Sequence, residues 1–191
     1  MRHHNKQAAV LVPHDAARRR FLKACALASL VLAARPAFAM AAAVREKSLS
    51  FYNIHTGEKL RAVYWADGRY IEDGLVEIDY ILRDHRRGEV HAIDRRLLDL
   101  LFDLHGLLDT RQPFHVISGY RSPATNRMLR AKSGGVAERS LHLVGRAIDI
   151  RVPGRKLAAL RQAAMQLSRG GVGYYPRSDF VHVDTGPVRY W

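Results

Sequence analysis

Hydrophobic residues recur at helical spacing in two long stretches of the chain. Residues 75–86 carry apolar side chains every three or four positions, and residues 94–108 place five leucines on one stripe. Asp94 stands ahead of this stripe, where a carboxylate can cap the first turn of a helix. Two further helices are predicted, one that begins at Ser122 and continues with a proline, and one over residues 155–168.

Shorter segments are bounded by turn residues and alternate between apolar and polar positions, which is typical of β-strands. The expected strands cover residues 49–54, 59–65, 114–118, 146–152, 170–174 and 180–185. The first two flank a turn at residues 55–58 and predict a hairpin. Because helices gather in the first half of the chain and strands in the second, the predicted fold class is α+β.

The first 39 residues follow a different pattern. A basic run, R-R-R-F-L-K at residues 18–23, precedes a short apolar run over 24–34, and A-F-A at 37–39 offers a cleavage site. The run resembles a twin-arginine export signal, which the twin-arginine translocation machinery reads as an address. A general secretory signal and a mitochondrial presequence are the alternatives. The apolar run is too short for a membrane span. We therefore expect cleavage near Ala39, a periplasmic protein and no stable membrane anchor.

Composition and charge narrow the class of partner. The chain has 191 residues, of which 48% are hydrophobic, and a formal net charge of +13. Residues 1–39 hold seven basic side chains and one acid, which leaves +7 for a single domain over residues 40–191. This charge favours an acidic polymer. No nucleic acid is expected as partner, because only a chain that retained residues 1–39 in the cytosol would meet it. The single cysteine, Cys25, excludes a disulfide framework and a cysteine-based zinc ribbon.

In each of the two strands expected at residues 146–152 and 180–185, ionisable residues lie on the face opposite the apolar residues. Asp149 lies on the face opposite the isoleucines of its strand, and His182 and Asp184 lie on the face opposite the valines of theirs. If the two strands are neighbours, Asp149 and His182 can bind one ion, and His142 can supply a third ligand. Two histidines and one carboxylate suit zinc with an open position, which indicates catalysis. The alternative is that these are ordinary polar residues of the fold.

The local sequence around these residues is specific. Residues 140–149 match S-x-H-x-x-G-x-A-x-D, which resembles the signature of the zinc D-Ala-D-Ala peptidases and their relatives of the hedgehog-type fold. S-G-Y-R-S at 118–122, F-V-H-V-D at 180–184 and G-V-G-Y-Y-P at 171–176 extend the resemblance to the murein endopeptidase K group. The resemblance covers residues 48–191. It implies a hedgehog- or DD-peptidase-like fold, with a small antiparallel sheet and flanking helices around an open zinc site.

The same resemblance implies roles for individual residues. His142, Asp149 and His182 would hold one zinc ion, Zn²⁺, per chain, which activates a water for attack on a peptide bond. Arg121 would stabilise the oxyanion or a substrate carboxylate, or else form a structural pair with a loop carbonyl. Asp179 and Asp184 are the candidate general bases. Asp184 is favoured because it shares a strand face with His182, although it could instead orient a ligand histidine.

The implied function is that of a periplasmic zinc peptidase that hydrolyses peptide cross-links between the stem peptides of peptidoglycan. A D-Ala-D-Ala carboxypeptidase of the same fold is one alternative, and a non-catalytic cell-wall binding module is another. The aromatic residues near the end of the chain could line a substrate groove or belong to the core. These are Tyr174, Tyr175, Tyr190 and Trp191.

Overall fold

The computed structural model describes residues 45–133 and 135–191, and the predicted signal peptide lies outside these residues. Eight strands form one open sheet in the order β3-β2-β1-β4-β5-β7-β6-β8. The strands are β1 (Glu46–Asn53), β2 (Lys59–Ala66), β3 (Arg69–Tyr70), β4 (Phe114–Ser118), β5 (Ala147–Arg151), β6 (Gly171–Tyr175), β7 (Phe180–Asp184) and β8 (Arg189–Tyr190). The helices are α2 (Glu72–Ile81), α3 (Arg95–Leu107), α4 (Pro123–Lys132), α5 (Leu157–Leu167) and a short 3-10 helix, η1 (Leu141–Val144). The α+β class is confirmed.

The sheet is larger than the small antiparallel sheet that was expected, and it is mixed. The pairs β1–β4 and β6–β8 are parallel, whereas the other neighbouring strands run antiparallel. Helices α2 and α3 lie in the connection between β2 and β4, and this long crossover permits β4 to run parallel to β1. The expectation of a small antiparallel sheet, which came from the resemblance, was wrong. The motifs that carry the resemblance lie within residues 118–184, and they do not specify the parallel pairs β1–β4 and β6–β8.

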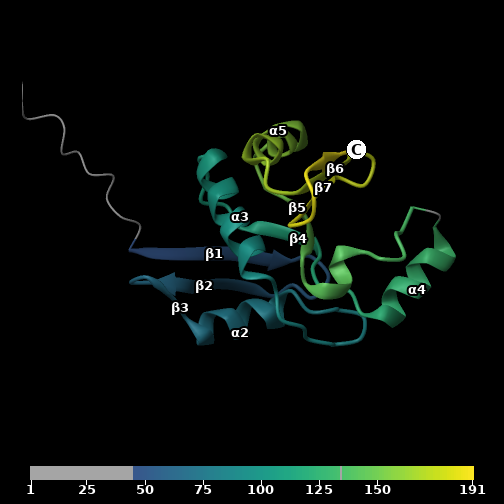
Figure 1. Cartoon of the computed structure of the whole chain (residues 1–191), viewed down its shortest axis with the longest axis horizontal. Helices are drawn as coiled ribbons and strands as arrows, with labels where there is room; N and C mark the ends of the chain where they lie inside the picture. The colour runs from purple at the N-terminus through teal and green to yellow at the C-terminus, as the bar shows by residue number, and fades with distance from the viewer. Residues whose placement is uncertain (1–44, 134) are drawn as a thin grey trace, which may run out of the picture. The chain divides into compact units, whose positions relative to one another are not determined.

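The leucine stripe of α3 provides much of the core, as predicted. All five leucines of the stripe are buried, and Asp94 caps the helix by accepting a hydrogen bond from the Arg96 backbone N–H. Helix α3 packs against β1 and α5, and α5 packs against β6 and β7. In Figure 1, α4 lies on the opposite side of the view from β3 and α2. No helix in the described part of the chain is long and apolar enough to span a membrane.

Helix α2 differs from its predicted bounds. It runs over Glu72–Ile81 instead of residues 75–86, and the chain turns immediately after it. The cause is Asp84, which is buried and accepts hydrogen bonds from the backbone N–H groups of Arg86 and Ser122. A buried carboxylate needs such donors, so the turn persists in place of further helix. The Ser122 contact also fixes the 118–122 segment beside the candidate site.

Candidate metal centre

The candidate centre lies on β5 and β7, the fifth and sixth strands in the order of the sheet. Strands β5 and β7 are antiparallel neighbours, and Asp149 stands directly opposite His182. The expectation that these two strands are adjacent is therefore confirmed. Ile148 and Ile150 are fully buried in the hydrophobic core, which leaves Asp149 on the opposite face of β5.

His142 reaches the same place from η1, just before β5. The Ser140 hydroxyl accepts a hydrogen bond from the His142 backbone N–H and caps this short helix. Gly145 ends it with φ 63°, and a Cβ there would stand 2.3 Å from the Ala92 carbonyl oxygen. Only glycine avoids that overlap, so the serine and glycine of the ten-residue motif shape the turn that presents His142.

Three side-chain atoms converge at the centre. His182 Nδ1 lies 2.8 Å from Asp149 Oδ1, His142 Nε2 lies 3.3 Å from the same oxygen, and the two ring nitrogens are 3.2 Å apart. The three residues are buried, and their ligand atoms all lie within 4.8 Å of one another. The structure thus brings together the three residues that the sequence singled out as metal ligands.

The outer nitrogen of each histidine has a fixed partner. His142 Nδ1 donates to the Gly119 carbonyl at 2.7 Å, and His182 Nε2 donates to Asp184 Oδ2 at 3.0 Å. A backbone carbonyl carries no proton, so a neutral His142 ring holds its proton on the outer nitrogen, whereas His182 has a carboxylate beside each of its nitrogens. With each outer nitrogen protonated, both inner nitrogens can present lone pairs to a cation bound beside Asp149. An inward-facing set of two lone pairs and a carboxylate fits a cation, and outer partners of this kind accompany most metal-binding histidines.

The electrostatics of the site favour a positive charge at its centre. Burial would raise the pKa of the Asp149 carboxyl, but the charge and hydrogen bonds of His142 and His182 outweigh it and hold that pKa well below its usual range. Burial would lower the pKa of His182, yet hydrogen bonds and charge from Asp149 and Asp184 raise it to about 9.

A pocket of about 500 Å³ opens above the three ligands. Arg121 lines it, with Nη2 3.7 Å from Asp149 Oδ2, and its guanidinium donates to Asn126 Oδ1 and Ser118 Oγ. Its buried Nε has no hydrogen-bond partner among the described residues. These partners are side chains, and no backbone carbonyl of residues 45–133 or 135–191 accepts a hydrogen bond from the Arg121 guanidinium. A positive group therefore lies at the edge of the pocket.

The two candidate bases have different surroundings. Asp184 is fully buried, and its Oδ2 contacts the His182 nitrogen that is turned away from Asp149. Asp179 is exposed and pairs with Arg151 at 2.8 Å, outside the pocket. The structure therefore brings Asp184 to the centre through His182 and does not bring Asp179 there.

The aromatic residues near the end of the chain divide between two roles. Tyr175 and Trp191 line the pocket, whereas Tyr174 packs against the core and Tyr190 donates its hydroxyl to the Met165 carbonyl. Sequence reasoning missed Arg139 and Arg189, which also line the pocket. Their spacing to the ligands carries no recognisable pattern, and the basic character of the domain was the only signal available.

An open pocket over a His-Asp-His group that could hold a metal ion fits a metal-dependent hydrolase. The sequence agrees with this class, because residues 41–191 match the family model described as "Peptidoglycan L,D-endopeptidase MepK". The chain therefore belongs to that family of metallopeptidases.

Individual relatives support the assignment. The chain is 47% identical over 182 residues to the peptidoglycan L,D-endopeptidase MepK of Escherichia coli K12, with 93% of this chain and 98% of the relative covered. The protein of the same name from Shigella flexneri matches equally. The probable peptidoglycan L,D-endopeptidase MepK of Haemophilus influenzae is 42% identical over 154 residues, which cover 80% of this chain and 83% of the relative.

Proposed function

We propose that this chain, a peptidoglycan endopeptidase by its family, uses one zinc ion to hydrolyse an L,D peptide bond in the cross-links between stem peptides. The single observation that carries the proposal is the inward-facing His142, Asp149 and His182 set at the floor of an open pocket. The L,D specificity rests on the names of the relatives. The open sheet with its helices agrees with the hedgehog- or DD-peptidase-like fold that the motifs imply.

Zinc fits this donor set because His and Asp are among its usual ligands, and three protein ligands leave a position for substrate or water. When bound, zinc supplies a Lewis acid that polarises the scissile carbonyl and makes water more acidic. The chain's own residues orient the site. Gly119 and Asp184 hold the outer nitrogens of His142 and His182, which keeps the inner nitrogens aimed at one point.

Arg121 is placed to bind negative charge on the substrate side of the centre. Its guanidinium borders the pocket 3.7 Å from Asp149, and its planar fork suits a carboxylate or a developing oxyanion. Stem peptides carry free carboxylates. We propose that Arg121 acts on the oxyanion or on such a carboxylate.

The contacts of Asp184 favour the orienting role over the role of general base. Its Oδ2 faces the outer nitrogen of His182, and its Oδ1 accepts hydrogen bonds from the backbone N–H groups of Gly171 and Gly186. Burial would raise the pKa of Asp184, but these hydrogen bonds and the one from Arg189 outweigh it and hold that pKa well below its usual range. We therefore propose that Asp184 fixes His182, and that Asp179 contributes little to the reaction.

Digestion of purified peptidoglycan sacculi by the mature protein tests the proposed function. New peptide ends should appear in its presence, should be absent when a chelator is added, and should return with added zinc. A D-Ala-D-Ala carboxypeptidase would instead release free D-alanine and leave the cross-links intact. A binding module would release nothing.

We also propose that residues 1–39 are a twin-arginine signal peptide that directs the protein to the periplasm. The paired arginines at 18 and 19 and the A-F-A at 37–39 support this proposal. Changing both arginines to lysine keeps the charge and removes the paired guanidinium groups, so we expect uncleaved precursor to accumulate in the cytoplasm. Immunoblots of cell fractions measure this. Normal periplasmic accumulation of the double-lysine variant would contradict twin-arginine export.

A further inference from the structure

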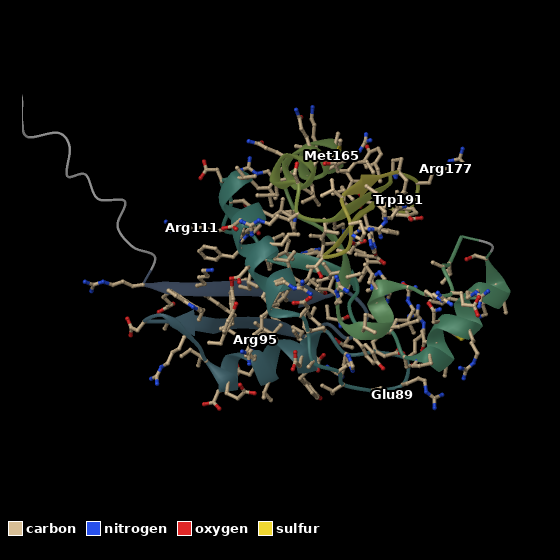
Figure 2. All side chains as sticks on the ribbon, in the orientation of Figure 1. Glu89, Arg95, Arg111, Met165, Arg177 and Trp191 are labelled. Carbon is tan, nitrogen blue, oxygen red and sulfur yellow. The ribbon has the colours of Figure 1, made fainter. Side chains whose placement is uncertain are left out.

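The last residues of the chain return to the metal centre. Strand β8 pairs in parallel with β6, so that Arg189 stands opposite Gly171. Trp191 continues this pairing, since its N–H donates to the Val172 carbonyl and its own carbonyl accepts from the Tyr174 N–H. Figure 2 shows Trp191 beside the ribbon of β6 and β7. His182 lies on β7.

Arg189 donates hydrogen bonds to Asp184 from two nitrogens. Nη2 lies 2.7 Å from Oδ2, and Nη1 lies 3.2 Å from Oδ1. The carboxylate itself is fully buried, and its Oδ2 is the atom that accepts from His182 Nε2. A fork of this kind fixes the plane of a carboxylate as well as its position. Arg189 thus holds Asp184 together with the backbone N–H groups of Gly171 and Gly186, and Arg189 is the only one of the three that contacts Oδ2.

Two glycines leave room for this contact. A Cβ on Gly171 would stand 2.5 Å from Asp184 Oδ2 and 2.7 Å from Arg189 Nη1. A Cβ on Gly186 would stand 3.0 Å from both Asp184 Oδ1 and Arg189 Nη1. A side chain at Gly171 would displace one of the two partners, so the backbone around the pair is shaped to admit it.

Trp191 completes the arrangement on the pocket side. Its ring centroid lies 5.3 Å from that of His182, and the Arg189 guanidinium lies over the indole at 5.0 Å. The indole N–H donates to the Tyr175 hydroxyl at 2.7 Å, which holds the ring against the pocket wall. The indole therefore limits the movement of both Arg189 and His182.

We propose that Arg189 is a positioning residue that aligns the metal ligand His182 by holding Asp184, with Trp191 packed over both. The inference rests on the proposed zinc-dependent function. Lysine cannot replace arginine fully here, because an ammonium is a point charge and cannot engage both carboxylate oxygens in one plane. The alternative is an ion pair that merely stabilises the end of the chain.

The test compares Arg189→Gln, Arg189→Lys and the control Arg169→Gln. Arg169 pairs with Asp103, and its side chain is 47% exposed against 44% for Arg189, so the control removes an arginine of similar exposure from an ion pair away from the pocket. The zinc dissociation constant is measured by competition with a chelating dye, and the ligand geometry is followed by the visible absorption spectrum of the cobalt-loaded protein. Values of kcat and KM at saturating zinc complete the comparison.

We expect Arg189→Gln to weaken zinc binding about tenfold, the lower end for an outer-shell partner. Its cobalt spectrum should change and kcat should fall more than KM rises. Arg189→Lys should recover part of each loss, and Arg169→Gln should match the unsubstituted protein. If Arg189→Gln does not fold, Arg189→Lys carries the test, because it retains the charge and loses only the fork.

The outcomes separate the two proposals. If the unsubstituted protein binds no zinc and cuts no cross-link, the proposed function fails. If the unsubstituted protein binds zinc and cuts cross-links, and the Arg189 variants keep its zinc affinity, cobalt spectrum and kcat, the positioning role is overturned while the proposed function stands. A lower melting temperature with those three readouts unchanged would also overturn it, since that is the result of a purely structural ion pair.

Discussion

Substituting His142 by alanine should abolish hydrolysis and lower zinc content to well below one ion per chain. The reason is that His182 and Asp149 would remain as the only protein ligands, and two ligands cannot hold the ion at useful occupancy. Zinc is measured in the purified mature protein by elemental analysis, and activity by the release of new peptide ends from sacculi. His55→Ala is the matched control, because His55 is an exposed histidine on the hairpin turn, outside the pocket.

The fold should survive this substitution. His142 lies in a short 3-10 helix, and its loss leaves the buried Gly119 carbonyl without this partner, which costs about 1–3 kcal/mol of stability. Circular dichroism and a thermal melt separate loss of metal from loss of structure. A folded His142→Ala protein that retained one zinc per chain would contradict the ligand assignment.

Replacing Asp184 by asparagine should weaken zinc binding by roughly 10–100-fold, the usual cost of losing an outer partner of a metal-binding histidine. Asparagine preserves the shape of the side chain but removes the charge that Arg189 and His182 both contact. Activity should therefore be low at limiting zinc and should recover as zinc is added. Titrating activity against free zinc measures both effects in one experiment.

Asp179→Asn is the companion variant, and we expect it to resemble the unsubstituted protein. Asp179 is exposed and contacts Arg151 outside the pocket, so its loss removes only a surface ion pair. The other outcome for Asp184→Asn is full zinc occupancy with a rate at least ~100-fold lower that added zinc does not restore, which would identify Asp184 as the general base. An inactive Asp179→Asn protein with intact zinc would assign that role to Asp179 instead.

The parts of the structure that depend on neighbours in the sequence were predictable. The leucine stripe of α3 and its Asp94 cap follow from local spacing, and both occur as expected. Strand alternation alone placed Asp149 and His182 on faces where they could meet, and β5 and β7 do pair at these residues. Alternation has a period of two, so once the apolar residues of a strand face the core, the residues between them must lie on the opposite face.

The remainder depends on contacts between distant segments. Helix α2 ends early because Asp84 binds the backbone of Ser122, which lies 38 positions further along the chain. The partner that orients the His142 ring is the backbone carbonyl of Gly119. Every residue has such a carbonyl, so the residue types do not indicate which one His142 contacts. Strand β8 has only two residues, too few for a recognisable pattern, so the approach of Arg189 to Asp184 could not be anticipated.

The most direct test of the metal-dependent endopeptidase function is mass spectrometry of the peptides released from sacculi, with and without a chelator. We predict that the mature protein splits cross-linked dimers at an L,D bond into two monomers, that the chelator stops this, and that zinc restores it. Undiminished cleavage by the fully zinc-depleted protein would contradict the metal centre. Release of D-alanine alone, with every dimer intact, would contradict the endopeptidase function.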